Sequence, residues 1–289
     1  MHISHIPVLL EETLAFLSVK PGGLYIDATL GGGGHAQEII GHGGKVLGID
    51  QDPISLKIAR QRLHPTHAKV VLGNFADLTT IAHKYNFAQV DGILFDLGVS
   101  SFQLDTPERG FSFQTDAPLD MRMSPDLQVT AADLVNALGR KELYELFTKL
   151  AQEQLAGPIA HAIIESRRLK PITTTLQLAG IIEQVKKPQH HKLHPATKVF
   201  QALRIAVNDE LNNLKAALPQ ALSLLKPQGR LVVISFHEGE DRIVKNFLKQ
   251  AALESQGAIL TKKPVTPEFL EVAQNQRSRS AKLRAFIKT

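Results

Sequence analysis

The sequence contains no cysteine and no tryptophan, and only 6% of its residues are aromatic. The absence of cysteine excludes disulfides, thiolate metal ligands and cysteine nucleophiles. No apolar run approaches the roughly 18 residues of a membrane-spanning helix, so no membrane partner is expected. Residues 1–7 lack the basic start and long apolar core of a signal peptide. A cytoplasmic location is therefore expected.

Charge is distributed unevenly over the 289 residues, whose net charge is +5. Residues 262–289 hold seven basic and two acidic side chains, and residues 165–198 hold the same numbers. Residues 96–126, in contrast, hold six acidic and two basic side chains. This pattern favours a protein that binds a polyanion on some faces, although chance clustering on solvated faces explains the charge alone equally well.

The first third of the chain alternates apolar strands with amphipathic helices. Short apolar runs at 24–26, 45–49, 69–72 and 91–95 predict buried strands. Between them, helical sequence begins near His35, at Pro53 and near Phe75. Repeated strand–helix units predict an α/β fold with a mostly parallel sheet that is covered on both faces.

The alternation stops after residue 104. Residues 104–125 have no clear period and predict a long loop, and four helical stretches follow before residue 187. We therefore expect a core formed by residues 1–104 and 196–289, interrupted by a helical insertion over residues 105–195. One long helix is expected over about 196–218. A strand at 229–235, a helix at 241–253 and two late strands then complete the sheet.

A glycine-rich turn follows the first strand, which ends at Asp27. Such a turn before a helix lets a ligand approach backbone N–H groups at the helix N-terminus. Gly31, Gly33 and Ala36 satisfy the dinucleotide pattern G-x-G-x-x-G/A, and Asp50 ends the second strand, where a carboxylate can accept ribose hydroxyls. This pattern does not separate NAD from S-adenosylmethionine.

Asp27 favours the second ligand, because a carboxylate repels a pyrophosphate but not a sulfonium or an ammonium group. Asp96 ends the fourth strand, at the edge where open α/β sheets bind ligands. Phe75, after the third strand, can flank an adenine or pack in the core. An NAD(P)-dependent oxidoreductase remains the alternative function, and a non-catalytic RNA-binding protein is a third possibility.

Several segments, in order along the chain, match a known family. The chain resembles the bacterial 16S ribosomal RNA (cytosine-N4)-methyltransferases, RsmH or MraW. The segments that carry the resemblance are 5–12, 27–35, 48–53, 91–101, 103–105, 109–113, 118–123, 194–197, 200–205, 235–237 and 240–245. The chain departs from the family at Phe102, where proline is usual, and after His237.

The resemblance implies a class I (Rossmann-like) methyltransferase core with an inserted helical domain for RNA recognition. It implies transfer of a methyl group from S-adenosyl-L-methionine to the N4 amine of a decoding-centre (P-site) cytidine. That cytidine belongs to the 16S rRNA of the small ribosomal subunit. The cofactor contacts that it implies are Gly33, Gly34, His35, Asp50, Phe75, Asp96 and Gln103.

Asp96 is also the candidate catalytic residue. A hydrogen bond from the cytosine N4–H to Asp96, or to the Leu97 carbonyl, would localise the nitrogen lone pair and orient it for transfer. The target base must be unstacked, which calls for an aromatic or Arg platform. Phe113 and Arg122 are candidates, although core and salt-bridge roles fit them as well. His237 is expected to be a substrate or structural contact rather than an essential base.

His190, His191 and His194 are spaced like metal ligands, but no acid or cysteine joins them in the sequence. We interpret them as part of an RNA-facing loop and expect no metal. The basic segments 167–198 and 277–284 are expected to contact RNA phosphates. The sequence leaves open whether the chain forms a homodimer.

Overall fold

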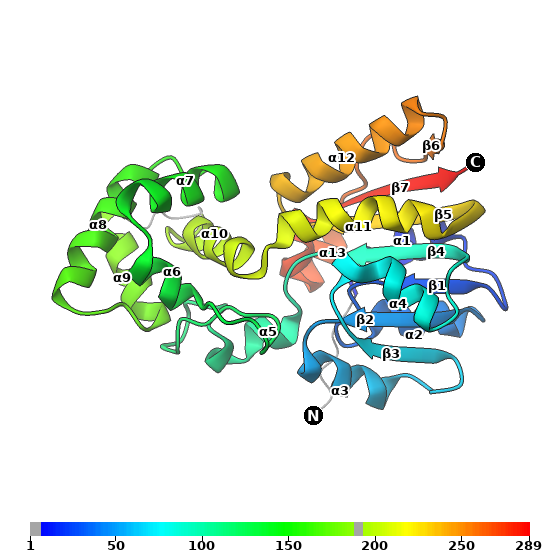
Figure 1. Cartoon of the computed structure of the whole chain (residues 1–289), viewed down its shortest axis with the longest axis horizontal. Coiled ribbons are helices and arrows are strands. Elements are labelled where there is room, and N and C mark those ends of the chain that lie inside the picture. Colours follow the sequence, from blue (N-terminus) through cyan, green and yellow to red (C-terminus); the bar gives the residue numbers. More distant parts are fainter. Residues whose placement is uncertain (1–6, 188–192) are drawn as a thin grey trace. The chain divides into compact units, whose positions relative to one another are not determined.

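The computed structural model describes residues 7–187 and 193–289 and divides into two compact units (Figure 1). The first unit comprises residues 1–100 and 211–289, and the second comprises residues 101–210. The second unit is thus wider at both ends than the insertion expected over 105–195. None of the helices in the described residues is long and apolar enough to span a bilayer.

The first unit is built on a sheet of seven strands among the described residues, in the order β3-β2-β1-β4-β5-β7-β6. The first five strands run parallel, and β7 is antiparallel to both of its neighbours. The expected α/β fold with a mostly parallel sheet is therefore confirmed. The strands are β1 Leu24–Asp27, β2 Lys45–Asp50, β3 Ala68–Leu72, β4 Val90–Asp96, β5 Leu225–Ser235, β6 Gly257–Ile259 and β7 Lys282–Lys288.

Helices cover both faces of this sheet, because successive residues of each strand point to opposite faces. Leu231 and Val233 of β5 pack with α4, α11 and α12, whereas Val232 and Ile234 belong to the opposite core, which includes α1, α2 and α3. Figure 1 shows α4 and α11 in front of the strands and α1 behind them. These helices are α1 Leu10–Leu17, α2 Gly34–Gly41, α3 Pro53–Arg62, α4 Leu78–Lys84, α11 Glu210–Leu224 and α12 Glu238–Leu253.

The helix starts follow local capping chemistry. Asp52 caps α3 by accepting a hydrogen bond from the Ile54 N–H, and Pro53 occupies the first turn, as the sequence predicted. Helix α1 was missed, because its eight residues follow Leu9 in the left-handed region rather than a polar cap. A short 3-10 helix, η1 Phe75–Asp77, precedes α4.

The second unit is helical apart from a long loop. The contacts of α7 with α8, of α8 with α9 and of α10 with α7 hold it together. These contacts explain why α10, assigned to the core from the sequence, belongs to this unit. Its elements are α5 Ser101–Asp105, the 3-10 helix η2 Pro107–Arg109, α6 Ala131–Ala137, α7 Arg140–Ala151, α8 Ala156–Leu169, α9 Thr175–Val185 and α10 Thr197–Asn208.

The single long helix expected over 196–218 was wrong. Helix α10 ends at Asn208, and Asp209 adopts the left-handed conformation with φ of 49° before α11 begins. The side chain of Asn208 is held by the backbone of the loop: its Oδ1 accepts from Met123 N–H and its Nδ2 donates to the Met121 carbonyl. Apolar periodicity alone gives no signal for such a break.

Candidate active site at the carboxyl edge of the sheet

Four parallel strands, β1, β2, β4 and β5, end at the same edge of the sheet. Their last residues are Asp27, Asp50, Asp96 and Ser235. The strand order reverses between β1 and β4, and ligands of open α/β sheets bind at such a switch point. The predicted site therefore lies at this edge.

Asp27, at the end of β1, is 1% exposed, and its Oδ1 accepts a 3.2 Å hydrogen bond from the Thr29 N–H. Burial raises the pKa of Asp27 to about 7, although the Thr29 N–H opposes the rise and the nearby charge of Asp50 adds to it. A positive charge bound beside Asp27 would stabilise its carboxylate. This electrostatic setting suits a cationic ligand better than a pyrophosphate.

Asp50, at the end of β2, holds the glycine turn in place. Its Oδ2 accepts a 2.8 Å hydrogen bond from the Gly31 N–H, and its Oδ1 accepts a 2.8 Å bond from the Asp52 N–H. Burial raises the pKa of Asp50 to about 6 against these amide hydrogen bonds. Because a carboxylate oxygen accepts more than one hydrogen bond, both oxygens keep capacity for ligand hydroxyls.

The turn itself requires glycine at two positions. Gly31 and Gly33 have φ of 51° and 80°, in the left-handed region that side chains disfavour. Gly33 is also the N-cap of α2, and a Cβ there would lie 3.2 Å from the side chain of Leu63. The start of α2 thus presents backbone without side chains, as a close ligand requires.

The beginning of the described chain packs onto this turn. The Nε2 of His35 lies 3.0 Å from the Val8 carbonyl oxygen, and a Cβ on Gly34 would approach the Pro7 ring to 2.7 Å. Sequence reasoning gave residues 5–12 no role beyond the family resemblance. Their contacts show that Pro7 and Val8 support the turn.

Asp96, at the end of β4, has the least satisfied carboxyl group of this edge. Its backbone N–H donates to Thr29 Oγ1 at 2.6 Å, and its Oδ2 lies 3.6 Å from His35 Nδ1. Its Oδ1 is buried and has no hydrogen-bond partner among the described residues. Burial raises the pKa of Asp96 well above its ordinary value, and the charges of Asp27 and Glu240 raise it further.

Phe75 lies just after β3, where the sequence placed it. Its ring meets that of Phe95 edge-on, with centroids 5.7 Å apart. Phe75 packs against the core from a partly exposed position. This arrangement leaves part of its side chain accessible to a ligand.

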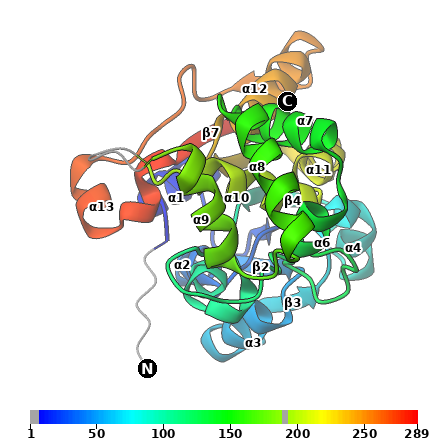
Figure 2. The same ribbon diagram turned by 90° about the vertical axis from the view of Figure 1, so that its left-hand side faces the viewer.

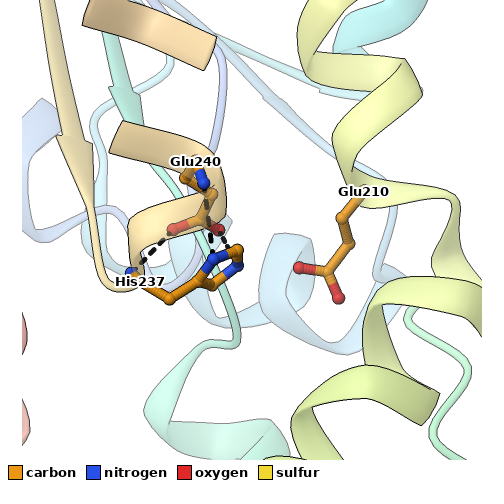
Figure 3. A group of neighbouring side chains, drawn as sticks. All are labelled: Glu210, His237 and Glu240. Atoms are coloured by element: carbon orange, nitrogen blue, oxygen red, sulfur yellow. Dashed lines mark hydrogen bonds and ion pairs between the residues drawn. The ribbon is translucent and has the colours of Figure 1, made fainter. Parts of the chain in front are cut away.

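His237 follows β5 and caps α12 (Figure 3). Its Nδ1 accepts a 3.3 Å hydrogen bond from the Glu240 N–H. The Glu240 Oε2 in turn accepts a 2.8 Å bond from the Phe236 N–H. Its Nε2 lies 3.2 Å from Glu240 Oε1. His237 therefore has a structural role at this edge, in line with its interpretation as a contact rather than a base.

Three predicted site residues belong to the second unit. Gln103 lies in α5 and is buried. Phe113 stacks on His194 with ring centroids 4.4 Å apart and meets Phe200 edge-on at 5.0 Å. Arg122 donates to both carboxylate oxygens of Asp120, at 2.7 and 2.8 Å. The structure thus gives Phe113 and Arg122 packing and salt-bridge partners.

The basic segment 167–198 also has structural contacts. Arg167 donates to the carbonyls at the end of α6, Lys186 pairs with Glu153 at 2.7 Å, and Lys198 donates to the Gln152 carbonyl. These three bases therefore have partners within the second unit, and the expected phosphate contacts of the segment stay a prediction. His190 and His191 lie outside the described residues.

The comparisons with known proteins cover the chain from end to end. The profile of the MraW methylase family matches residues 2–289. The chain belongs to the MraW methylase family. It is accordingly a methyltransferase with a Rossmann-like core, and its cofactor is S-adenosyl-L-methionine. The oxidoreductase alternative is not supported.

Curated relatives share nearly half of its residues. The ribosomal RNA small subunit methyltransferase H of Carboxydothermus hydrogenoformans is 46% identical, over 99% of this chain and 98% of that protein. The protein of the same name from Geobacter sulfurreducens is 47% identical, over 99% of each chain. A solved rRNA methylase from Streptococcus thermophilus is 12% identical with a TM-score of 0.46, over 99% of each chain, and adds nothing to this assignment.

The site fits the cofactor of this family. The glycine turn exposes backbone at the start of α2, and Asp50 offers acceptors for hydroxyl groups. Asp27 is buried and Asp96 is partly exposed, and among the described residues no lysine or arginine ion-pairs with either, although His35 lies beside Asp96. A donor set of this kind suits a ligand that carries positive charge and a ribose.

Proposed function

We propose that this chain transfers a methyl group from S-adenosyl-L-methionine to the N4 amine of the decoding-centre (P-site) cytidine of 16S rRNA, within the small ribosomal subunit. The observation that carries the proposal is the match to relatives named ribosomal RNA small subunit methyltransferase H over nearly the whole chain. The basic pI of 9.3 agrees with an RNA substrate.

We assign the cofactor to the carboxyl edge of the first unit. Asp50 would accept the ribose hydroxyls, and Phe75 would flank the adenine. When bound, the cofactor supplies an electrophilic methyl group on a sulfonium. The full set of proposed cofactor contacts is Gly33, Gly34, His35, Asp50, Phe75, Asp96 and Gln103.

Asp96 would orient the acceptor nitrogen. The N4 lone pair of cytosine is delocalised into the ring, so the amine needs to be held in line for transfer. The Oδ1 of Asp96, which has no partner among the described residues, would accept a hydrogen bond from N4–H. Burial raises the pKa of Asp96, and a positive charge bound beside it would favour the ionised form.

Phe113, Arg122 and His237 remain the proposed RNA contacts. Phe113 would have to exchange its stacking on His194 for stacking on a base, and Arg122 would have to share its pairing with Asp120. His237 keeps its cap on α12 and would contact the RNA without changing partners.

The test is methyl transfer by the purified chain to small subunits that lack the modification, with a labelled cofactor and mapping of the methylated nucleotide. We expect label on N4 of one cytidine. Absence of label on small-subunit RNA, or label on another base, would overturn the proposal. In parallel, S-adenosylhomocysteine but not NAD(H) should raise the melting temperature.

Two finer expectations belong with this function. An enzyme of ribosomal RNA would act in the cytoplasm. A homodimer is tested directly by light scattering on the purified chain, since a monomeric mass would end that prediction.

A further inference from the structure

The chain between β6 and β7 lies at the same edge of the sheet as the candidate site. Lys282, the first residue of β7, pairs with Ser235, the last residue of β5. Helix α13 (Phe269–Gln274) and the 3-10 helix η3 (Gln276–Ser280) directly precede it. We call residues 262–282 the α13 segment. Because β4, β5 and β7 are neighbours, its end lies two strand spacings, about 10 Å, from the end of β4.

The α13 segment is anchored at its base. The Glu271 carboxylate accepts a 3.0 Å hydrogen bond from the Leu9 N–H, and Val265 pairs with Leu283 of β7. Figure 2 shows α13 beside α1 at the margin of the first unit. The segment therefore has a fixed attachment to the sheet edge.

Two large apolar side chains of this segment face water. Phe269 is 84% exposed and Leu270 is 69% exposed. Phe269 is the only phenylalanine among the exposed large apolar residues in the described part of the chain. A bare aromatic ring gains free energy by covering its face with a partner.

The basic side chains of residues 262–289 separate into two groups. Arg284 donates to Asp241 at 2.6 and 3.0 Å, and Lys288 donates to the carbonyls of Ser223 and Leu225. Those two bases hold β7 to its surroundings and lie outside the α13 segment. The α13 segment contains five basic and two acidic side chains, namely Lys262, Lys263, Arg277, Arg279 and Lys282 against Glu268 and Glu271.

We propose that the α13 segment is a docking surface for single-stranded ribosomal RNA next to the target nucleotide. An unpaired nucleobase stacks on Phe269, and RNA phosphates contact the lysine and arginine side chains of the segment. The inference rests on the proposed function and names how its substrate is held. An exposed ring in a segment with more basic than acidic side chains suits single strands, because stacking needs a free nucleobase face and the RNA backbone is an anion. Duplex RNA offers no free base face along its length. A protein partner would need apolar contact but not stacking, which the variants below distinguish.

The absence of tryptophan provides a direct probe. Phe269→Trp places the sole tryptophan of the chain on this surface and preserves a stacking ring. We expect its fluorescence to be quenched when small subunits lacking the modification are added. Leu253→Trp is the matched control, because Leu253 is 71% exposed at the far end of α12. Unchanged Phe269→Trp fluorescence at subunit concentrations that saturate methyl transfer would overturn the proposal.

Kinetics separate stacking from apolar contact. Phe269→Ala should raise the KM for small subunits about tenfold with kcat changed less than about twofold. The reason is that the lost stacking weakens RNA binding but does not alter the methyl-transfer step. Phe269→Trp should keep the original KM, whereas Phe269→Leu should behave like the alanine variant. If Phe269→Leu restored the KM fully, the surface would be an apolar protein contact and RNA stacking would be wrong.

Salt dependence tests the charged part of the surface. Arg279→Gln should reduce the slope of log affinity against log salt by roughly 0.7, the value for one phosphate contact on a single strand. Lys249→Gln, an exposed base on α12, should leave the slope unchanged. Equal slopes for Arg279→Gln and the original chain would argue against phosphate contacts here.

Failure of this inference is distinguishable from failure of the proposed function. If the unaltered chain transfers no methyl group to small-subunit RNA, the proposed function fails. If it does so, and every Phe269 variant keeps the original KM, only the docking surface fails. Because Phe269 is exposed, its variants should melt within a few degrees of the original chain, which circular dichroism checks.

Discussion

The two ends of strand β4 carry the same residue type in opposite electrostatic states. At its beginning, Asp91 accepts hydrogen bonds from the Leu24 N–H at 2.9 Å and from Lys226 at 2.8 Å. Burial would raise the pKa of Asp91, but Lys226 and the Leu24 N–H outweigh it and hold the pKa below its ordinary value. At its end, Asp96 has a raised pKa and an unpartnered oxygen. Asp91 is thus paired with a base, whereas one oxygen of Asp96 has no partner among the described residues.

This difference separates stability from function within one sheet. Ion pairs and amide donors at the amino edge fix the strands. At the carboxyl edge, Asp27, Asp50 and Asp96 all have raised pKa values, which is typical of sites that bind or react. A positive charge bound beside Asp27 and Asp96 would favour their ionised forms.

The largest expected effect follows from replacing the aspartate at each end of β4 by asparagine, one at a time. Asp96→Asn keeps the shape of the side chain but cannot ionise, so kcat at saturating cofactor should fall at least about 100-fold. Asp91→Asn should leave kcat within about twofold. The measurement is single-turnover methyl transfer to unmodified small subunits. Full turnover by Asp96→Asn would exclude a catalytic role for Asp96.

The second prediction concerns stability against pH. The pKa of Asp27 is about 7 in the folded chain and about 4 when unfolded, so its stabilising contribution is present below pH 4 and is lost as pH rises through 7. The free energy of unfolding of the ligand-free chain should therefore fall by on the order of 2 kcal/mol between pH 5 and pH 8. The free energy of unfolding of the Asp27→Asn variant should fall less over the same interval, which thermal unfolding at the two pH values measures. Parallel pH dependences for both chains would contradict this account.

The smallest effect is expected at the amino edge. Lys226 is 39% exposed, so solvent screens its pair with Asp91, and Lys226→Met should lower the free energy of unfolding by only about 0.5 kcal/mol at pH 7. Because the pKa of Asp91 is lowered, this contribution is present above pH 4 and disappears as pH falls further. Denaturant titrations at pH 7 and pH 3 measure it. A substantial loss of methyl transfer in Lys226→Met would contradict the view that the amino edge contributes to stability and not to catalysis.

The position of the site was predictable, but its electrostatic state was not. Asp27, Asp50 and Asp96 each end an apolar run, so parallel pairing alone brings them to one edge. Whether an aspartate is satisfied depends on distant residues. Lys226 is 135 positions from Asp91, and Glu240 is still further from Asp96 in the sequence. No local pattern reports such partners.

Contacts with residues distant in the sequence, or a local backbone conformation, also explain the features that the sequence did not predict. The left-handed conformation of Asp209 splits the expected long helix, and the apolar period runs through it without interruption. For Phe113 the sequence left a stacking platform and a core role open, and the rings of His194 and Phe200, more than 80 positions later, contact it in the structure. Pro7 contacts Gly34 through a turn that only the folded chain forms.

The insertion of the second unit between β4 and β5 also sets an order of events during synthesis. The Leu97 N–H donates to the Ile234 carbonyl at 3.0 Å, and 137 positions separate the two residues. Closing so long a flexible connection costs about 2 kcal/mol more than closing a ten-residue one, unless the intervening unit has already folded and shortened it. Until Ile234 leaves the ribosome, β4 can pair only with β1 and stays an edge strand with the apolar sequence Ile93-Leu94-Phe95. The nascent chain is therefore most vulnerable to aggregation while the second unit is being made.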